Sequence, residues 1–422
     1  MKISRRHFLQ WASGAGAIGT LRAGPVSASR GVPRVIVAGG GFAGLNFARA
    51  LRELAPAVDI LVIDQHAQYV RCPGSNQVIA GLRPMGSLIH DPARGLIQRG
   101  IQFHQGTIIG MDPLRRVLQL EGGERLGFDR LLVAPGIELR WDKLEGYGKL
   151  QSLKVPHAWQ AGPQTQLLKD QLASLPDGGL FMMTVPENPY RCPPGPYERA
   201  SLIASRLKEV NPRAKILILD AKTKFSKEKG FKTAWARLYP GMIEWISYET
   251  EGGIDHIDAE QRRVTTAFNR YRADVLNVIP PQKAAKLADV LGLTDASGWC
   301  PIDPVTFESK KIPGILVIGD AASYGPVPKS AFAAQTEARA CALAVSLSLL
   351  NSSPPETRLI NHCYSLISPD KAISVTGVYG AKKGAMPEVL KLMESPPESD
   401  QRQEYRQAMD WLDLLVRTTF GT

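Results

Sequence analysis

The chain has 422 residues, of which 44% are hydrophobic and 22% charged, and its formal net charge is +11 at pH 7. This length predicts two or three domains, and the composition is that of a globular protein rather than a disordered or fibrous one. Lysines and arginines form no run interleaved with aromatic residues, so the charge gives no indication of nucleic-acid binding. Beyond the N-terminus, no stretch approaches the roughly 20 apolar residues that cross a bilayer.

The first 28 residues have the pattern of an export signal. Residues 4–10 (SRRHFLQ) place two arginines before a weakly apolar stretch rich in Gly and Ala, and residues 26–28 (VSA) form a small-residue cleavage site. The twin-arginine route carries folded proteins, which suits an enzyme that acquires a redox cofactor before export. We therefore expect a periplasmic protein, a compartment in which disulfides persist.

The stretch VIVAGGGFAG predicts a strand, a tight turn and the start of a helix. Gly39 permits the turn, Gly41 lets the backbone approach a pyrophosphate, and Gly44 allows helix and strand to pack closely. The next predicted strand, DILVID, ends in Asp64, an acid positioned for ribose hydroxyls. Together these features predict a dinucleotide-binding unit.

A second strand–loop–helix–strand outline begins at Gly178 but lacks the glycine turn. Its loop, PENPYRCPPGP, has prolines where a nicotinamide site needs glycines. Proline has no N–H and a fixed φ, so this loop is not expected to bind a pyrophosphate. We expect the fold of a nicotinamide domain without its ligand site. The prolines are Pro186, Pro189, Pro193, Pro194 and Pro196.

Two further strands end in segments typical of two-domain flavoproteins. FDRLLVAPG closes on Pro135 and Gly136, where the chain would return to an FAD domain. GILVIGDAA ends in Gly319 and Asp320, and such an Asp holds the ribityl or pyrophosphate region. Lys329, just before the following helix, is a candidate for the pyrimidine oxygen of the flavin, with a solvated surface lysine as the alternative.

The predicted fold is α/β, with two Rossmann-like, glutathione-reductase-like domains and a small α+β C-terminal interface domain. The FAD-binding domain is discontinuous, because the second domain is inserted into it. The expected bounds are 1–28 for the signal, 29–160 and 284–352 for the FAD domain, 161–283 for the second domain and 353–422 for the interface domain.

The chain has five cysteines and no C-x-x-C pair, so it has no c-type haem site of its own, and we expect no metal site. A small buried hydrophobe is a suitable interpretation for Cys341 and Cys300. It suits Cys192 poorly, because Cys192 lies just before a helix whose dipole favours a thiolate.

Several long motifs resemble the flavoprotein subunit of flavocytochrome c sulfide dehydrogenase, in the FAD-dependent pyridine nucleotide-disulfide oxidoreductase superfamily. They are RCPPGPYERAS, FSKEKGFKTAWARLYPGMIEW, PHAWQAG, GWCPIDPVTFES and NHCYSLISP. The resemblance implies FAD, a redox-active disulfide between Cys192 and Cys363, and a thioether from Cys72 to the flavin. It also implies a c-type cytochrome subunit as partner.

The chemistry of these residues is consistent with that activity. A disulfide is an electrophile for hydrosulfide, which attacks one sulfur and leaves a persulfide. Glu198 matches a family acid and is a candidate for managing a proton. The alternative is an ordinary first-turn Glu stabilised by the helix dipole.

We therefore expect an exported enzyme that oxidises hydrosulfide to sulfur or polysulfide and passes electrons to a cytochrome c. One alternative is a sulfide:quinone oxidoreductase, although the heavily charged residues 400–413 disfavour membrane seating. Another is a non-catalytic flavin-binding partner in which a Cys192–Cys363 disulfide is merely structural. An NADH-dependent disulfide reductase is disfavoured by the proline loop.

Overall fold

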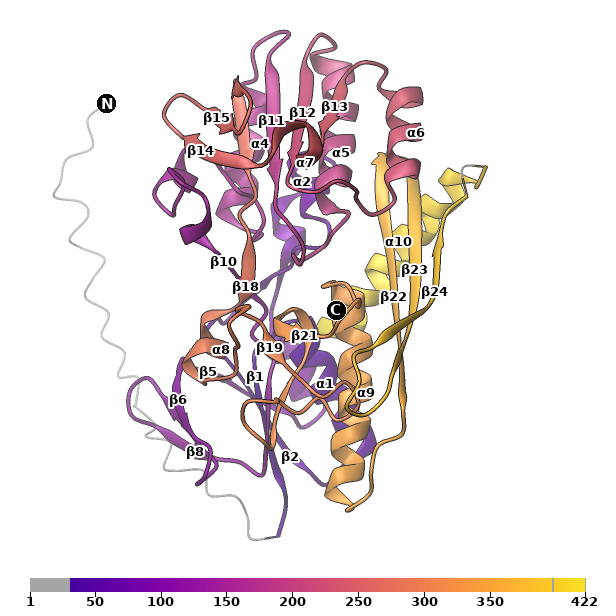
Figure 1. The fold of residues 1–422 in the computed structure, drawn as a ribbon. Coiled ribbons are helices and arrows are strands. Elements are labelled where there is room, and N and C mark those ends of the chain that lie inside the picture. Colours follow the sequence, from indigo (N-terminus) through magenta and orange to yellow (C-terminus); the bar gives the residue numbers. More distant parts are fainter. Residues whose placement is uncertain (1–30, 397, 422) are drawn as a thin grey trace, which may run out of the picture.

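The structure is a computed structural model that describes residues 31–396 and 398–421. It has a five-stranded and a four-stranded parallel sheet, and an antiparallel sheet near the C-terminus (Figure 1). This arrangement confirms the predicted fold class. The predicted export signal lies outside the described residues.

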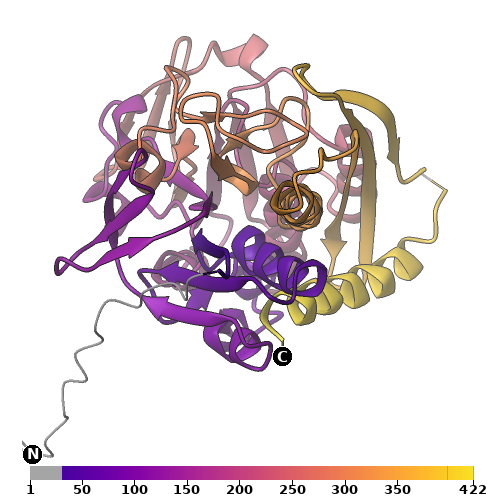
Figure 2. The same cartoon turned by 90° about the horizontal axis from the view of Figure 1, so that it is seen from below.

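The first sheet has the strand order β20-β9-β1-β2-β5 and lies in the lower half of Figure 1. Its central strand is fully buried and, after its first residue Arg34, apolar, as is typical of a parallel sheet covered on both faces. Helices α1 (Phe42–Leu54) and α9 (Ala331–Leu349) pack against each other beside it (Figure 2). The strands are β1 (Arg34–Ala38), β2 (Asp59–Asp64), β5 (Gln102–Gln105), β9 (Arg130–Val133) and β20 (Ile315–Val317).

The second sheet has the order β13-β12-β11-β17 and lies in the upper half of Figure 1. The chain reaches it through β10 and leaves it through β18, and these two strands pair antiparallel. Its strands are β11 (Leu180–Val185), β12 (Lys215–Asp220), β13 (Ile243–Ile246) and β17 (Val275–Val278), and the linking strands are β10 (Ile137–Leu139) and β18 (Gln282–Ala284). Its helices are α4 (Pro163–Ala173), α5 (Gly195–Val210), α6 (Glu228–Leu238) and α7 (Tyr248–Glu251).

Smaller elements fill the connections. Two three-stranded antiparallel sheets are β6 (Ile108–Asp112), β7 (Val117–Leu120) and β8 (Arg125–Gly127), and β14 (Ile254–Asp258), β15 (Arg263–Thr266) and β16 (Arg270–Arg272). Short pairs are β3 (Tyr69–Val70) with β4 (Ile89–His90), and β19 (Cys300–Pro301) with β21 (Ala322–Ser323). Short helices are α2 (Ser75–Ile79), α3 (Pro92–Ile97) and α8 (Lys286–Val290).

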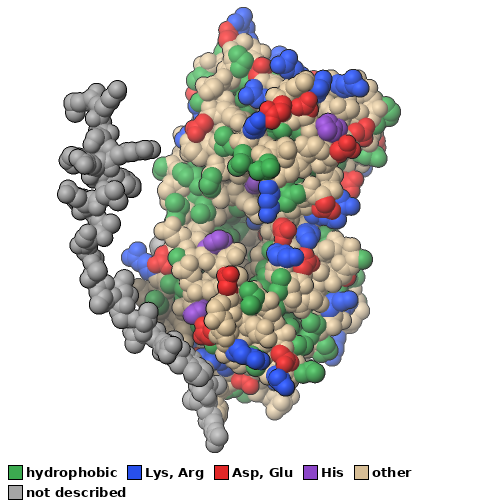
Figure 3. All heavy atoms as spheres, turned by 90° about the vertical axis from the view of Figure 1, so that its left-hand side faces the viewer, with side chains coloured by type: hydrophobic (Ala, Val, Ile, Leu, Met, Phe, Trp, Pro, Cys, Tyr) green, Lys and Arg blue, Asp and Glu red, His purple; other side chains and the backbone are tan. Residues whose placement is uncertain are grey.

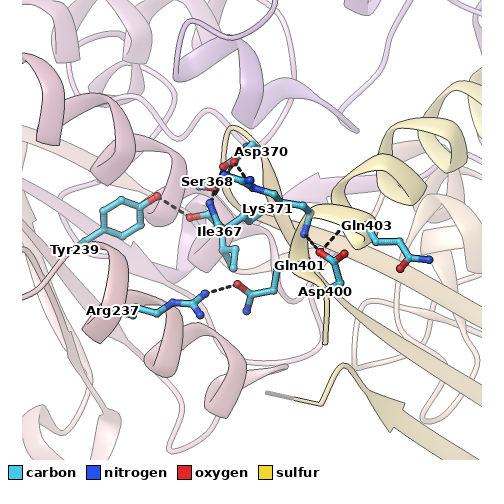
Figure 4. A network of polar contacts seen from close by, with 10 residues as sticks. Arg237, Tyr239, Ile367, Ser368, Asp370, Lys371, Asp400, Gln401 and Gln403 are labelled. Atoms are coloured by element: carbon cyan, nitrogen blue, oxygen red, sulfur yellow. Dashed lines mark hydrogen bonds and ion pairs between the residues drawn. The ribbon is translucent and has the colours of Figure 1, made fainter. Parts of the chain in front are cut away.

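The C-terminal unit is an antiparallel sheet with one long helix, coloured yellow in Figure 1. It comprises β22 (Thr357–Ser368), β23 (Lys371–Ala381), β24 (Glu388–Glu394) and α10 (Gln401–Phe420). Hydrogen bonds join it to the second domain (Figure 4): the Tyr239 hydroxyl donates to the Ile367 carbonyl at 2.7 Å, and Arg237 donates to Gln401.

The end of α10 is anchored on the first domain. The Asn46 amide donates to Thr419 at 2.8 Å, Arg49 donates to the Thr418 carbonyl, and the ring of Phe420 stacks on His90 with centroids 4.4 Å apart. One helix therefore contacts all three parts of the chain. Within the part of the chain that the structure describes, no helix has both the length and the apolar character needed to cross a membrane.

Candidate active site

A cavity of about 630 Å³ lies where the three parts meet. Its wall is formed by the C-terminal ends of strands in the first sheet, the loop before α5, strand β22 and helix α10. Every predicted site residue except Gly44 and Lys329 lines it: Gly39, Gly41, Asp64, Cys72, Pro135, Gly136, Cys192, Glu198, Gly319, Asp320 and Cys363. The fold thus gathers residues from distant segments around one space.

The glycine turn has the close approaches that its sequence predicts. Gly39 has φ +123°, and a Cβ there would lie 2.3 Å from the Ala134 carbonyl oxygen. A Cβ on Gly44 would lie 2.0 Å from the Gly39 carbonyl oxygen, so Gly44 serves helix–strand packing rather than the cavity wall. Helix α1 starts after Gly41 with no side-chain cap, which leaves its first N–H groups available to an anion.

Two carboxylates occupy the positions expected of cofactor-binding acids. The Asp64 carboxylate accepts from the Gly40 N–H at 2.6 Å and from the His66 N–H at 2.9 Å, which fixes it at the end of β2. Asp320 is half-buried, and its Oδ1 atom is buried without a hydrogen-bond partner among the described residues. Burial raises the pKa of Asp320. An unpartnered buried oxygen facing a cavity fits the hydroxyl groups of a ribityl chain.

Lys329 lies behind the cavity wall rather than on it. Its ammonium donates to the carbonyls of Asp320 and Ala322, both at 2.8 Å, and lies 3.8 Å from the ring centroid of Trp299. Burial lowers the pKa of Lys329 to about 8. The side chain therefore holds the loop that carries Asp320, and its contact with a pyrimidine oxygen stays a prediction.

Cys192 and Cys363 come from different parts of the chain and line the same cavity. The Cys192 backbone N–H donates to the Lys329 carbonyl at 2.7 Å, and Cys192 has φ +58°. The Cys363 thiol, on β22, donates to the Asn361 side-chain oxygen at 3.4 Å. Both are free thiols in the structure, so the predicted disulfide stays a prediction. Burial raises the pKa of both.

Glu198 lies beside these cysteines at the start of α5, and both its oxygens are held. Oε1 accepts from the Leu366 N–H at 2.9 Å and Oε2 accepts from the Asn76 amide at 2.9 Å. Burial raises the pKa of Glu198, while these two bonds oppose the rise. This carboxyl is thus more than a solvated first-turn residue, and its catalytic role stays a prediction.

Cys72 lies in the loop between β3 and α2. Its thiol donates to the Trp159 carbonyl at 3.9 Å and faces the cavity. Arg191 also lines the cavity and donates to the same carbonyl. The covalent attachment of a flavin to Cys72 stays a prediction.

Three cations at or beside the cavity were not predicted: the half-buried Arg191 and the buried Arg199 and Lys227. Arg199 is 1% exposed, and its guanidinium donates to Asn277 at 2.7 Å and to the Ala158 carbonyl at 2.6 Å. The signal that could have indicated them is a charged residue inside an unusual motif, since RCPPGPYERAS and FSKEKGF contain all three.

The second domain offers no comparable nucleotide site. Asp220 ends β12 as Asp64 ends β2, but its side chain is fully buried. It accepts from the Tyr197 hydroxyl at 2.5 Å, from Trp245 at 2.9 Å and from Lys222 at 2.5 Å. The chain's own donors therefore occupy the acid that a ribose would need.

Figure 3 shows one face of the molecule, hollowed near its middle. Lys and Arg side chains are interspersed with Asp and Glu over this face rather than gathered by sign. The face thus presents no large patch of one charge.

Three family models match successive parts of the chain. Residues 33–167 match the pyridine nucleotide-disulphide oxidoreductases, residues 165–280 the central part of the sulfide dehydrogenase [flavocytochrome c] flavoprotein chain, and residues 355–420 the flavin-binding part of flavocytochrome c sulphide dehydrogenase. A stretch of 48 residues is 42% identical to the flavoprotein chain from Chlorobaculum thiosulfatiphilum and covers 100% of that sequence and 11% of this chain. The chain belongs to the flavocytochrome c sulfide dehydrogenase flavoprotein family.

More distant relatives of this flavoprotein chain share its extent and fold. Mitochondrial sulfide:quinone oxidoreductase from Mus musculus is 22% identical over 369 residues, covering 80% of this chain and 77% of the mouse protein. The structure of sulfide:quinone oxidoreductase from Aquifex aeolicus superposes with a TM-score of 0.75 at 17% identity, covering 93% of this chain and 92% of that one. The reductase in the covalent putidaredoxin reductase–putidaredoxin complex gives a TM-score of 0.60 at 15% identity, covering 91% of this chain and 95% of that one. The family models and the 42% identical stretch confirm the predicted family, and these distant likenesses show the shared fold.

Proposed function

We propose that this chain is the flavoprotein subunit of a periplasmic sulfide:cytochrome c oxidoreductase. It oxidises hydrosulfide to sulfur or polysulfide and passes the electrons to a separate c-type cytochrome chain. The observation that carries the proposal is that Cys192 and Cys363 line the same cavity as the glycine turn at Gly39. Membership of the flavoprotein family supports the same activity.

The residues around the cavity fit FAD. The turn at Gly39 and the free start of α1 suit a pyrophosphate, and Asp64 suits the adenosine ribose. The unpartnered oxygen of Asp320 suits a ribityl hydroxyl. FAD, when bound, supplies an acceptor for an electron pair. Cys72 lines the same space and would tether the cofactor through a thioether.

The two cysteines supply the sulfur chemistry. With the pair oxidised, the hydrosulfide sulfur bonds to one cysteine sulfur while the Cys192–Cys363 bond breaks, and the other sulfur leaves as a thiolate with the electron pair. The first cysteine then carries a persulfide. Glu198, which accepts from Asn76 and Leu366, would take up the proton that the persulfide loses.

A quinone acceptor is the second candidate, because similarity to sulfide:quinone oxidoreductases extends over most of the chain. That reading requires an apolar surface that seats on a membrane. The exposed residues of α10 are mainly polar or charged, among them Arg402, Arg406, Asp410 and Asp413. This composition favours a water-soluble acceptor such as a cytochrome.

The deciding experiment compares acceptors. Anaerobic FAD-loaded protein receives sulfide, and electron transfer to a c-type cytochrome and to a short-chain ubiquinone analogue is followed by absorbance. We expect cytochrome reduction to exceed quinone reduction by a large factor. Preferential quinone reduction would support the second candidate. A flavin that sulfide leaves oxidised would instead support a non-catalytic flavin-binding partner. Cell fractionation of the full-length chain tests the periplasmic location.

A further inference from the structure

A buried lysine lies beside the Cys363 end of the cavity and has no role in the chemistry above. Lys227 precedes α6, and it is 1% exposed. Its ammonium donates to the Cys363 carbonyl at 3.3 Å and to the Ser365 hydroxyl at 2.7 Å. Because both acceptors belong to β22, the side chain reaches from the second domain into the C-terminal sheet.

The contacts of this ammonium are neutral. Among the ion pairs of residues 31–396 and 398–421, none involves Lys227, and only its backbone N–H donates to Glu394, at 2.9 Å. A buried ammonium is costly without an anion, so buried lysines are usually paired. Burial lowers the pKa of Lys227, and the groups that raise it are, in order, Cys363, Glu198, Cys192 and Glu394.

The two cavity cysteines differ in the charge that faces them. Burial raises the pKa of both thiols. At Cys363, Lys227 is the strongest influence in the opposite direction, and Glu198 is only the weakest upward one. At Cys192, Glu198 is the strongest influence after burial and raises the pKa further, while Lys227 and Arg191 lower it less strongly. Negative charge is therefore more favourable on the sulfur of Cys363 than on that of Cys192.

Other titratable groups surround the pair. Burial and Lys227 lower the pKa of His362, which keeps this neighbour neutral rather than competing as a cation. The pKa of Tyr379 is raised by burial and by Cys363, so this phenol also stays neutral. The groups that face Lys227 and the two cysteines are Glu198 from α5, Arg191 from the loop before it, His362 from β22, Tyr379 from β23 and Glu394 from β24.

We propose that Lys227 is the countercharge of the Cys363 sulfur and holds it as a thiolate when the cysteine pair is reduced. The inference rests on the proposed sulfide chemistry, because that chemistry leaves negative charge on sulfur in this cavity. The proton that Cys363 gives up resides on the amine of Lys227. Thiolate and ammonium form together, and neither is left buried without a partner. Lys227 is thus a positioning residue that makes Cys363 ionise before Cys192.

The test measures thiol ionisation without sulfide. In reduced, FAD-loaded Cys192→Ser and Cys363→Ser proteins, iodoacetamide labelling of the remaining cavity cysteine is quantified peptide by peptide between pH 5 and 10. We expect Cys363 to label with the lower pH midpoint. Adding Lys227→Met to the Cys192→Ser protein should slow labelling of Cys363 at pH 7 by about ten- to a thousandfold, since one opposite charge moves a nearby pKa by about 1 to 3. Lys227→Arg should restore most of the rate.

The matched control is Lys222→Met. Lys222 is another buried lysine of the second domain, but it is bonded to Asp220 at 2.5 Å and no cysteine influences its pKa. We expect this change to leave Cys363 labelling as it was. Equal midpoints for the two cysteines, or an unchanged rate in Lys227→Met, would overturn the inference.

The outcome stays decisive if Lys227→Met fails to fold by circular dichroism, because the comparison of Cys363 with Cys192 needs no lysine variant. The labelling experiment also distinguishes a failure of this inference from a failure of the proposed function. Sulfide that leaves the flavin oxidised would reject the activity while the labelling midpoints still report the charge at Cys363.

Discussion

The two parallel sheets begin with the same outline of strand, loop and helix, yet their loops have opposite chemistry. In the first, the turn at Gly39 and Gly44 brings backbone atoms together more closely than any Cβ would allow. The start of α1 is left uncapped, and Asp64 faces the cavity. This unit is open to a dinucleotide.

In the second unit, the corresponding groups are missing or already bonded within the chain. Pro193, Pro194 and Pro196 have no N–H, and the Gly195 N–H donates to the Cys192 carbonyl at 2.8 Å. The acid that would bind a ribose, Asp220, is occupied by donors from the chain itself.

The difference shows that the same scaffold can hold either a ligand or a reactive side chain at this position. Proline removes the donors that bind phosphate, and it also stiffens the loop. The stiff loop, with Cys192 at φ +58° and bonded to the Lys329 carbonyl, holds a thiol at the cavity. We therefore interpret the second unit as a support for sulfur chemistry, and the following changes test that comparison.

The largest effect is expected from the cysteines. Cys192→Ser and Cys363→Ser should each retain fold and FAD but lose sulfide-driven cytochrome reduction by several orders of magnitude, because the proposed electrophile is the bond between these two cysteines. Turnover and thermal stability are measured on the same preparations. Lower stability with largely intact turnover per folded molecule would mean that the disulfide is only structural.

Glu198→Gln should lower turnover by about 10²- to 10⁴-fold, the range for loss of a general acid or base. The same substitution should also change how the free energy of unfolding depends on pH. Burial raises the pKa of Glu198 above its unfolded value, so the folded state binds the proton more tightly and loses stability as pH rises through that window.

Gln has no proton to lose, so the variant should become more stable relative to the parent as pH rises above the ordinary pKa of a glutamate. Urea unfolding at several pH values measures the difference. A difference independent of pH would contradict the burial of this carboxyl.

The glycine turn of the first unit should be sensitive to a single carbon atom. Gly44→Ala places a Cβ 2.0 Å from the Gly39 carbonyl oxygen, so we expect a loss of about 1–3 kcal/mol in unfolding free energy and a lower FAD content. Gly86→Ala is the control, because a Cβ there meets no atom within 4 Å. Equal FAD content in the two variants would argue against a flavin at this turn.

The smallest effect on turnover is expected at Cys72. If its sulfur tethers FAD, denaturing the parent in acid should leave yellow fluorescence on the protein, and Cys72→Ser should release it while much of the turnover remains. Free FAD from the denatured parent would exclude the tether.

The sequence was sufficient to predict those parts of the site that residues close together in the chain form. The glycine turn, the proline loop and the acids that follow strands are local patterns, and nearly all of them line the cavity. It was insufficient where a side chain bridges distant segments. Lys227 reaches the carbonyl of Cys363, and Glu198 accepts from Leu366, contacts that depend on how the C-terminal sheet docks. Lys329 was placed near the right loop, but its ammonium is bound to two backbone carbonyls.

The central claim is that electrons enter this protein from sulfide and not from a nicotinamide nucleotide. The most direct measurement is anaerobic stopped-flow absorbance of the FAD-loaded protein, mixed separately with sulfide, NADH and NADPH. The account predicts rapid bleaching of the flavin by sulfide and none by either nucleotide on the same time scale. Bleaching by NADH or NADPH with sulfide inert would contradict it.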